Sequence, residues 1–315
     1  MSWFRKNLSR KTKKSVASNK KNDQGCSENQ EQSGFEISDQ NHNKWIRDEH
    51  LKEHGHISVK NDSSKNHFWK IDRTSSQNEP SWTFASPSAD GQLYVTYNMD
   101  EEVTMEKQGE KEINFTMLLQ ADGKLLFRAE SSPNRYLVQN REGQLEMKTT
   151  DNPTDEMEWM ISYIEPSLGK PSLASSYSAQ IRHGTESKKW LSSGPANNYH
   201  VQQVQTSATQ NWTITPSTGH IFQFSSGSCH ITKDLIFGDS SNAAKFESTK
   251  SGSGVTLQCT DNRKYIHGPE DDGDLELNTA KSKATAWEMP IKNAIFIVCK
   301  KILLSEIPIQ LPMDV

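Results

Sequence analysis

One module of this chain reads LLFRAE at 125–130, NRYLV at 134–138, GQLEM at 143–147 and EWMI at 158–161. Each piece has the apolar–polar alternation of a half-buried strand, and Gly, Pro, Asn, Ser or Asp separates it from the next. This pattern predicts four short β-strands, and the fourth begins beside a bulky aromatic residue, Trp159.

The module recurs six times, and the copies around 93–117 and 221–246 match least well. Its closing aromatic residues lie 34 to 53 residues apart and are Trp69, Phe115, Trp159, Trp212, Phe246 and Trp287. In four copies an anchor on the second strand precedes the closing residue by 22 to 24 residues. A period near forty is typical of an array of one small unit. Anchors and closing residues together predict a core that contains Trp45, Trp69, Tyr136, Trp159, Trp190, Trp212, Phe246, Tyr265 and Trp287.

Three such units can bury their apolar faces together by closing a six-stranded barrel capped by three hairpins, which is a β-trefoil. Six units therefore predict an all-β chain of two tandem β-trefoils. A six-bladed propeller is the alternative, but the loop lengths vary too much for blades around one axis. A Pro-, Gly- and Ser-rich stretch at 166–176 also divides the copies three and three. The expected divisions are a disordered basic arm at 1–32, trefoils at 33–165 and 166–292, and an apolar tail at 293–315.

The N-terminal arm is strongly basic, whereas the rest of the chain is acidic. All eight basic residues of the arm lie within the first 21 positions, where no acidic residue occurs: Arg5, Lys6, Arg10, Lys11, Lys13, Lys14, Lys20 and Lys21. The chain has a net charge of −4, so the remainder carries −12. This asymmetry suggests an anionic partner for the arm, namely an acidic protein, nucleic acid or phospholipid head groups. A solubilising tail is the simpler interpretation.

Composition places the protein in the cytoplasm and gives no motif of catalysis. No apolar signal-peptide region and no stretch of 18 apolar residues is present. Four cysteines without CxxC spacing indicate free thiols in a reducing compartment. We find no nucleophile elbow, HExxH, P-loop or dinucleotide motif, so we expect a protein that is not an enzyme and has no cofactor. His50, His54 and His56 lack the further ligands that a zinc site needs, so we expect no metal.

Two segments could bind a partner. Gln210-Asn211-Trp212 matches the QxW signature of ricin-type lectin trefoils, but it occurs only once. The hairpin at 58–69 places Ser63 and Ser64 between Lys60 and Lys65, directly before Trp69.

The modules resemble the repeat of fascin-type β-trefoils over about residues 33–292. The family's repeat has a basic residue followed by an aromatic residue and an aliphatic one, then Gly-x-Leu, then Trp before an alternating strand. The third and sixth units carry this pattern in Asn134-Arg135-Tyr136-Leu137, Gly143-Gln144-Leu145 and Trp159-Met160-Ile161, and in Arg263-Lys264-Tyr265-Ile266, Gly273-Asp274-Leu275 and Trp287-Glu288-Met289.

The resemblance implies a cytosolic, cytoskeleton-associated protein that binds actin filaments and cross-links them. Fascins have four trefoils, whereas six units make two. In the family, a phosphorylatable Ser in a Lys-rich stretch of the first unit's final hairpin touches actin. By position this implies an actin-binding site at Lys60, Ser63, Ser64 and Lys65. A carbohydrate-binding trefoil, or a nuclear or protein-interaction adaptor that uses the basic arm, remains an alternative function.

The segment after Trp287 is apolar and lies beyond the six modules. Residues 294–299 have high β-propensity and no charge, so they would be sticky if exposed. We expect this tail to pack on the second trefoil, and a docking segment for a partner is the alternative. Pro308 and Pro312 predict that residues 305–315 are irregular.

Overall fold

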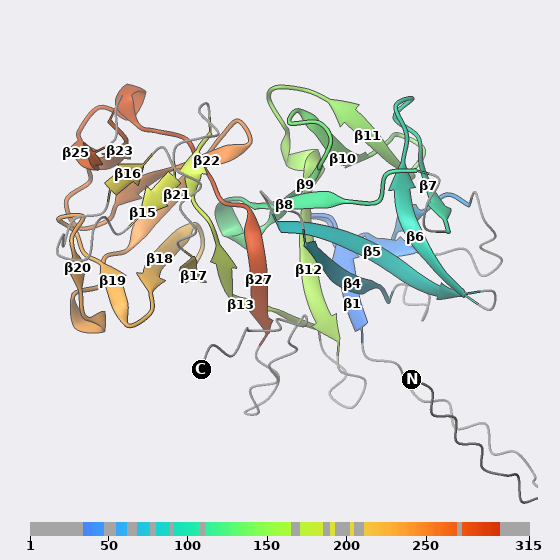
Figure 1. The fold of residues 1–315 in the computed structure, drawn as a ribbon, viewed down its shortest axis with the longest axis horizontal. Coiled ribbons are helices and arrows are strands. Elements are labelled where there is room, and N and C mark those ends of the chain that lie inside the picture. Colours follow the sequence, from blue (N-terminus) through green and yellow to red (C-terminus); the bar gives the residue numbers. More distant parts are fainter. Residues whose placement is uncertain are drawn as a thin grey trace, which may run out of the picture. The chain divides into compact units, whose positions relative to one another are not determined.

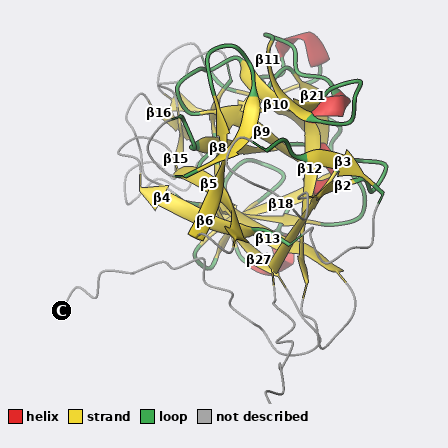
Figure 2. Ribbon diagram, turned by 90° about the vertical axis from the view of Figure 1, so that its right-hand side faces the viewer, coloured by secondary structure: helices red, strands yellow, loops and turns green. Residues whose placement is uncertain are grey.

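A computed structural model gives the fold of the chain (Figure 1). The structure describes residues 34–46, 55–61, 68–75, 80–88, 91–107, 111–164, 171–184, 190–192, 202–204, 211–269 and 273–296. All strand pairs in these ranges are antiparallel, and the helical segments among them are short 3-10 turns, so the chain is all-β as the alternation predicts (Figure 2). None of these turns is long or apolar enough to cross a bilayer.

The first half, 34–164, holds twelve strands that match the first three modules and add one strand. They are β1 (Gly34–Ser38), β2 (Lys44–Ile46), β3 (Ser58–Lys60), β4 (Lys70–Ser75), β5 (Pro80–Ser88), β6 (Gly91–Tyr97), β7 (Val103–Glu106), β8 (Phe115–Leu119), β9 (Leu125–Ala129), β10 (Arg135–Gln139), β11 (Leu145–Thr149) and β12 (Glu158–Ile164). β1 pairs with β12, β4 with β5, and β8 with β9, so strands of different modules join side by side. Hairpins β2–β3, β6–β7 and β10–β11 extend from them.

The second half, 171–296, repeats this arrangement. Its strands are β13 (Pro171–Ala179), β14 (Arg182–His183), β15 (Trp190–Ser192), β16 (Gln202–Val204), β17 (Trp212–Pro216), β18 (Ile221–Ser226), β19 (Cys229–Ile231), β20 (Phe237–Gly238), β21 (Phe246–Ser251), β22 (Gly254–Cys259), β23 (Tyr265–His267), β24 (Gly273–Asp274), β25 (Glu276–Asn278), β26 (Trp287–Glu288) and β27 (Ile291–Phe296). β13 pairs with both β17 and β27, and β21 pairs with β22.

Two strands lie where the sequence pattern did not predict them. β13 begins at Pro171, inside the Pro-, Gly- and Ser-rich stretch at 166–176, and it pairs with β12 as well as with β27. The tail expected from residue 293 begins inside β27, which lies beside β13 between the two halves (Figures 1 and 2). The buried residues of β13, Tyr177 and Ala179, follow that stretch and alternate with the half-buried Ser178.

All six closing aromatic residues are buried, each with at most 1% of its surface exposed. The indole N–H donates to a backbone carbonyl of the module's second strand in three copies: Trp69 to Trp45 at 3.1 Å, Trp159 to Leu137 at 3.2 Å and Trp212 to Leu191 at 3.2 Å. The hydrogen bond satisfies a polar group that the core would otherwise leave unpaired. These contacts also make Trp45, Leu137 and Leu191 equivalent positions.

The sequence pattern matched Trp45 of the first module with Tyr136 of the third, whereas the hydrogen bonds match Trp45 with Leu137, one residue later. Trp45 lies in the main core, but Tyr136 belongs to a separate small cluster with Leu118 and Leu126. Tyr265, expected in the core, is only half-buried, and the neighbouring Ile266 occupies the core instead. Since strand side chains alternate between faces, a shift of one residue moves the whole set to the other face. The side chain of Trp190 lies outside the described part of the chain.

Strand β5 was missed by the sequence reasoning. Its Trp82 and Phe84 are fully buried, and the indole of Trp82 donates to the carbonyl of Ile291 at 3.0 Å. Two prolines, Pro80 and Pro87, obscured the Ser-Trp-Thr-Phe alternation between them, because proline usually argues against a central strand. β5 belongs to the second module and contacts the end of the second half.

Candidate functional sites

The segment 58–69 begins with β3, the second strand of the β2–β3 hairpin, which presents Lys60 to solvent. β3 is held from both sides. Val59 is buried opposite Trp45 in the β2–β3 ladder, and its N–H donates to the carbonyl of Gly143 at 2.6 Å. Gly143 has φ +77, a conformation that suits glycine at this turn. The base of the hairpin is therefore well anchored. Ser63, Ser64 and Lys65 lie outside the described residues.

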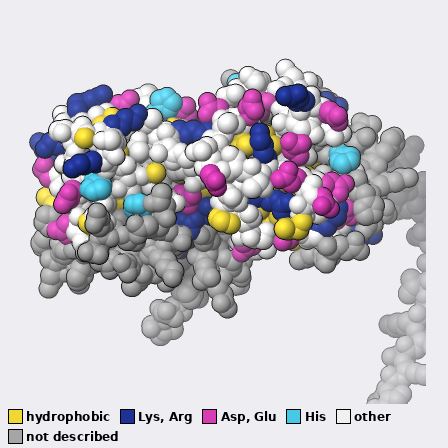
Figure 3. Space-filling view, turned by 90° about the horizontal axis from the view of Figure 1, so that it is seen from above, with side chains coloured by type: hydrophobic (Ala, Val, Ile, Leu, Met, Phe, Trp, Pro, Cys, Tyr) yellow, Lys and Arg dark blue, Asp and Glu magenta, His cyan; other side chains and the backbone are white. Residues whose placement is uncertain are grey.

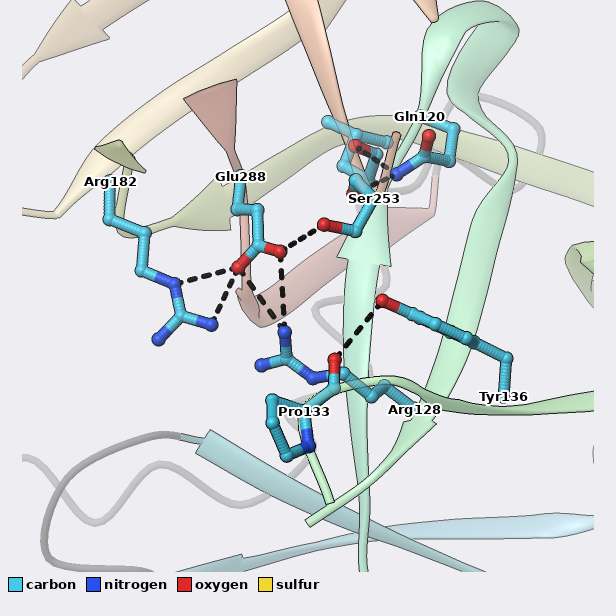
Figure 4. Close-up of polar contacts among 8 residues, drawn as sticks. Gln120, Arg128, Pro133, Tyr136, Arg182, Ser253 and Glu288 are labelled. Carbon is cyan, nitrogen blue, oxygen red and sulfur yellow. Dashed lines mark hydrogen bonds and ion pairs between the residues drawn. The ribbon is translucent and has the colours of Figure 1, made fainter. Parts of the chain in front are cut away.

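A buried ionic cluster joins the two halves (Figure 4). Glu288 on β26 accepts hydrogen bonds from Arg182, directly opposite on β14, with Nε at 2.8 Å and Nη2 at 2.6 Å. Arg128 on β9 of the first half reaches the same carboxylate, its Nη1 lying 3.3 Å from Oε1 and 3.2 Å from Oε2. The hydroxyl of Ser253 donates to Oε1. The carboxylate thus accepts from groups on three separate segments of the chain.

The electrostatics of this cluster favour an ionised Glu288. Burial raises the pKa of Glu288, but Arg128 and Arg182 act in the opposite direction and hold it below its ordinary value. Arg128, Arg182 and Glu288 are each exposed by 5% or less. A group so deeply buried cannot touch a macromolecular partner, so the cluster stabilises the junction between the halves. Nothing in sequence spacing could have identified it, because Arg128 and Glu288 are 160 residues apart.

Tyr136 lies beside this cluster (Figure 4). Its hydroxyl donates to the carbonyl of Pro133 at 3.2 Å. Burial raises the pKa of Tyr136, and the positive charge of Arg128 opposes that rise. The phenol is therefore neutral and serves as a packing residue at the junction.

Further contacts reinforce the junction. Lys250 on β21 lies 2.7 Å from Glu158 and 3.0 Å from Asp155, and its hydrogen bond and charge lower the pKa of Asp155. The side-chain amide of Gln120 donates to the carbonyl of Ser253 at 2.9 Å. The hydroxyl of Tyr177 donates to the carbonyl of Gly123 at 2.9 Å. Together with the β12–β13 pairing, these contacts make the halves one continuous body.

A polar hollow of about 470 Å³ lies between the first and third modules. The turn at 39–41, the end of β10 with its following turn, and the 3-10 turn Asp155–Met157 border it. Its ionisable lining residues are Asp39, Arg141, Glu146, Lys148, Asp155 and Glu156. The size is within the range of small-molecule sites, but no aromatic side chain lines the hollow.

The remaining predicted sites are placed as follows. The basic arm, with His50 and His54, lies outside the residues that the structure describes, and His56 is exposed. The Trp of the QxW match, Trp212, is a fully buried core residue. On the face drawn in Figure 3, basic and acidic side chains are interspersed. The described surface there offers no large field of one sign, so any charged contact must be local.

No protein-family model matches the sequence, and no curated protein matches it. Among solved structures, a mosquitocidal holotoxin is similar at 15% identity with a TM-score of 0.35. The similarity covers 81% of this chain and 34% of the toxin chain, so the chain spans about a third of that protein. A likeness of this degree carries no argument about function.

Proposed function

We propose that the chain is a non-enzymatic scaffold of two tandem β-trefoils that binds acidic protein surfaces, with actin filaments as the partner. The observation that carries the architecture is the repeated contact of a closing indole with the carbonyl of its own module's second strand, at separations of 24, 22 and 21 residues. Three modules in each half, with hairpins extending from the paired strands, fit two closed barrels.

The resemblance of the modules to fascins supports actin as the partner, and the chemistry of the first hairpin is compatible with it. Lys60 is exposed on an anchored strand, and Lys65 follows five residues later in the sequence. Lysines on a rigid support are attracted to an acidic surface, and this attraction weakens as salt rises. Phosphate on Ser63 or Ser64 would add about −1.5 to −2 charge beside these lysines and weaken the contact.

Co-sedimentation with filamentous actin at two salt concentrations tests this function. The double variant Lys60→Glu with Lys65→Glu should lose filament binding by on the order of tenfold or more, because it turns attraction into repulsion. A matched control makes the same change of charge at Lys233 and Lys245, which are exposed in the second half. Equal loss in both variants, or no pelleting of the wild type at low salt, would contradict the proposal.

Deletion of the basic arm and a test of sugar binding separate actin binding from the two alternative functions. Deleting residues 1–21 should leave actin binding intact, whereas an adaptor that uses the arm would lose its partner. The polar hollow is the one observation that favours a carbohydrate ligand. A lectin would be released from a glycan column by free sugar and would ignore the change at Lys60.

A further inference from the structure

A basic residue of β4 stands where the strand pattern would place an apolar one. In the β4–β5 ladder, Ile71 lies opposite Phe84. Two residues further along the same ladder, Arg73 lies opposite Trp82. Directly opposed residues project from the same face of a sheet, and the three apolar members of these pairs are buried. Arg73 therefore continues the core face of β4, although its side chain is exposed. Such a break in the apolar pattern is typical of a functional position.

A lysine from the end of the second half comes to the same place. The indole N–H of Trp82 donates to the carbonyl of Ile291 at 3.0 Å, and Lys292 is the next residue of β27. Ile291 and Asn293 pair with consecutive residues of β13, so Lys292 is the additional residue of a β-bulge. A bulge changes the direction of a side chain, and bulges are common beside functional sites. Strand pairing and bulge together bring Lys292 to the region of Arg73.

Arg73 and Lys292 act on each other as like charges. Burial lowers the pKa of the half-buried Lys292, and the positive charge of Arg73 lowers it further. Partial burial also lowers the pKa of Arg73. Within the part of the chain that the structure describes, no carboxylate forms an ion pair with either side chain. Two neighbouring cations in a partly dry environment repel each other, so a bound anion would stabilise both.

We propose that Arg73 and Lys292 bind a phosphate group, which is carried either by a soluble compound or by a phospholipid head group. A phosphate monoester has about −1.5 to −2 charge at neutral pH, which matches two cations, whereas a carboxylate has a single charge. The guanidinium group offers parallel N–H donors to phosphate oxygens, and a lysine ammonium binds phosphate as a point charge.

Apolar neighbours strengthen the attraction at this site. Ile71 and Trp82 line a small cavity whose other lining residues are aliphatic or aromatic, so the cations have a low dielectric on that side. The site shares no residue with the hairpin at 58–69. It is therefore independent of the proposed function, and a failure of actin binding would leave it standing.

Isothermal titration calorimetry of the full chain with inorganic phosphate measures the affinity. The variant Arg73→Gln with Lys292→Gln should bind phosphate at least about tenfold more weakly, because it removes both charges. Lys292→Arg keeps the charge and should stay within about threefold of the wild type. The matched control Lys233→Gln with Lys245→Gln makes the same change of net charge at exposed positions and should bind like the wild type.

The unfolding midpoint gives a second readout, which a merely structural role of the pair would not move. Phosphate at about ten times its Kd should raise the midpoint of the wild type above that in chloride of equal ionic strength. The midpoint of Arg73→Gln with Lys292→Gln should be the same in both salts. The single variant Lys292→Gln alters the fold less and should show a smaller rise than the wild type. Equal rises in all three proteins would overturn the site.

Vesicle flotation distinguishes the two sources of phosphate. Phosphatidylcholine vesicles that contain a phosphorylated inositol lipid should carry more wild type than double variant if a head group is the ligand. The basic arm is the same in both proteins, so only the difference between them reports on this site. Calorimetric binding of inorganic phosphate without such a difference assigns the site to a soluble compound. A wild type that binds neither, or equal losses of affinity in the double variant and the Lys233/Lys245 control, would overturn the proposal.

Discussion

Replacing Glu288 with glutamine removes the negative charge that two buried arginines share. Arg128 and Arg182 would remain, each exposed by only 5%, with a neutral amide in place of their common carboxylate. The substitution changes the size of the side chain very little, so the measured effect reports charge and hydrogen bonding. Breaking a buried ion pair in this way destabilises proteins by about 3–5 kcal/mol, because it leaves a buried charge uncompensated.

Urea unfolding followed by the fluorescence of the buried tryptophans measures this effect. A loss of 3–5 kcal/mol would lower the midpoint by on the order of 1–2 M urea. Glu247→Gln is the matched control, because Glu247 makes the same kind of pair with Arg263 at 3.1 Å while its side chain is 43% exposed. Exposed pairs contribute only about 0–1 kcal/mol, so the control should unfold close to the wild type.

The unfolding free energies of the wild type and of Glu288→Gln can also be compared as a function of pH. Because the folded protein holds the pKa of Glu288 below the ordinary value of 4.5, the unfolded state binds the proton more readily. This stabilisation is present above pH 4.5 and disappears as pH falls through the lowered folded pKa. The difference in unfolding free energy between wild type and Glu288→Gln should therefore be largest at neutral pH and shrink in acid. A glutamine variant within 1 kcal/mol of the wild type at pH 7 would refute the role assigned to this cluster.

Two further perturbations test the junction and the core. Gly254→Ala should destabilise the protein by about 1–3 kcal/mol, because the new Cβ would lie 2.5 Å from the carbonyl oxygen of Trp287. Gly273→Ala is the control, because the nearest atom to its new Cβ would be 3.8 Å away, and it should unfold like the wild type. Equal unfolding midpoints of the two variants would show that the backbone at Gly254 moves aside without a loss of stability. Deleting residues 291–315 should give a chain that aggregates, because the deletion removes β27 and exposes the core beneath it. Deleting only 297–315 should leave a soluble monomer, as measured by size-exclusion chromatography. A monomeric product from both deletions would contradict the place given to β27.

Much of the strand pattern could be predicted from local sequence. Alternation of apolar and polar residues marks one buried face of a strand, and a repeated aromatic residue marks where each module closes. This was sufficient for β9 to β12 and for the burial of Trp69, Trp159 and Trp287. It was insufficient for β5 and β13, since the prolines of one and the serines of the other dominate composition, although both strands bury aromatic side chains.

The candidate sites divide in the same way. Lys60, Ser63, Ser64 and Lys65 are visible in the sequence, because they depend on short distances along the chain. The polar hollow is visible only in the tertiary structure, because its lining comes from segments about a hundred residues apart.

By itself, the sequence determined that the chain is all-β and that its closing aromatic residues are buried, because side-chain periodicity and hydrophobicity are local properties. Tertiary structure alone decided the register of the anchors, where Leu137 and not Tyr136 is equivalent to Trp45. It also decided that Arg128 meets Glu288 across the junction. Both depend on which strands come to lie beside each other, and a pairing between distant segments has no signal in the spacing of residues along one of them.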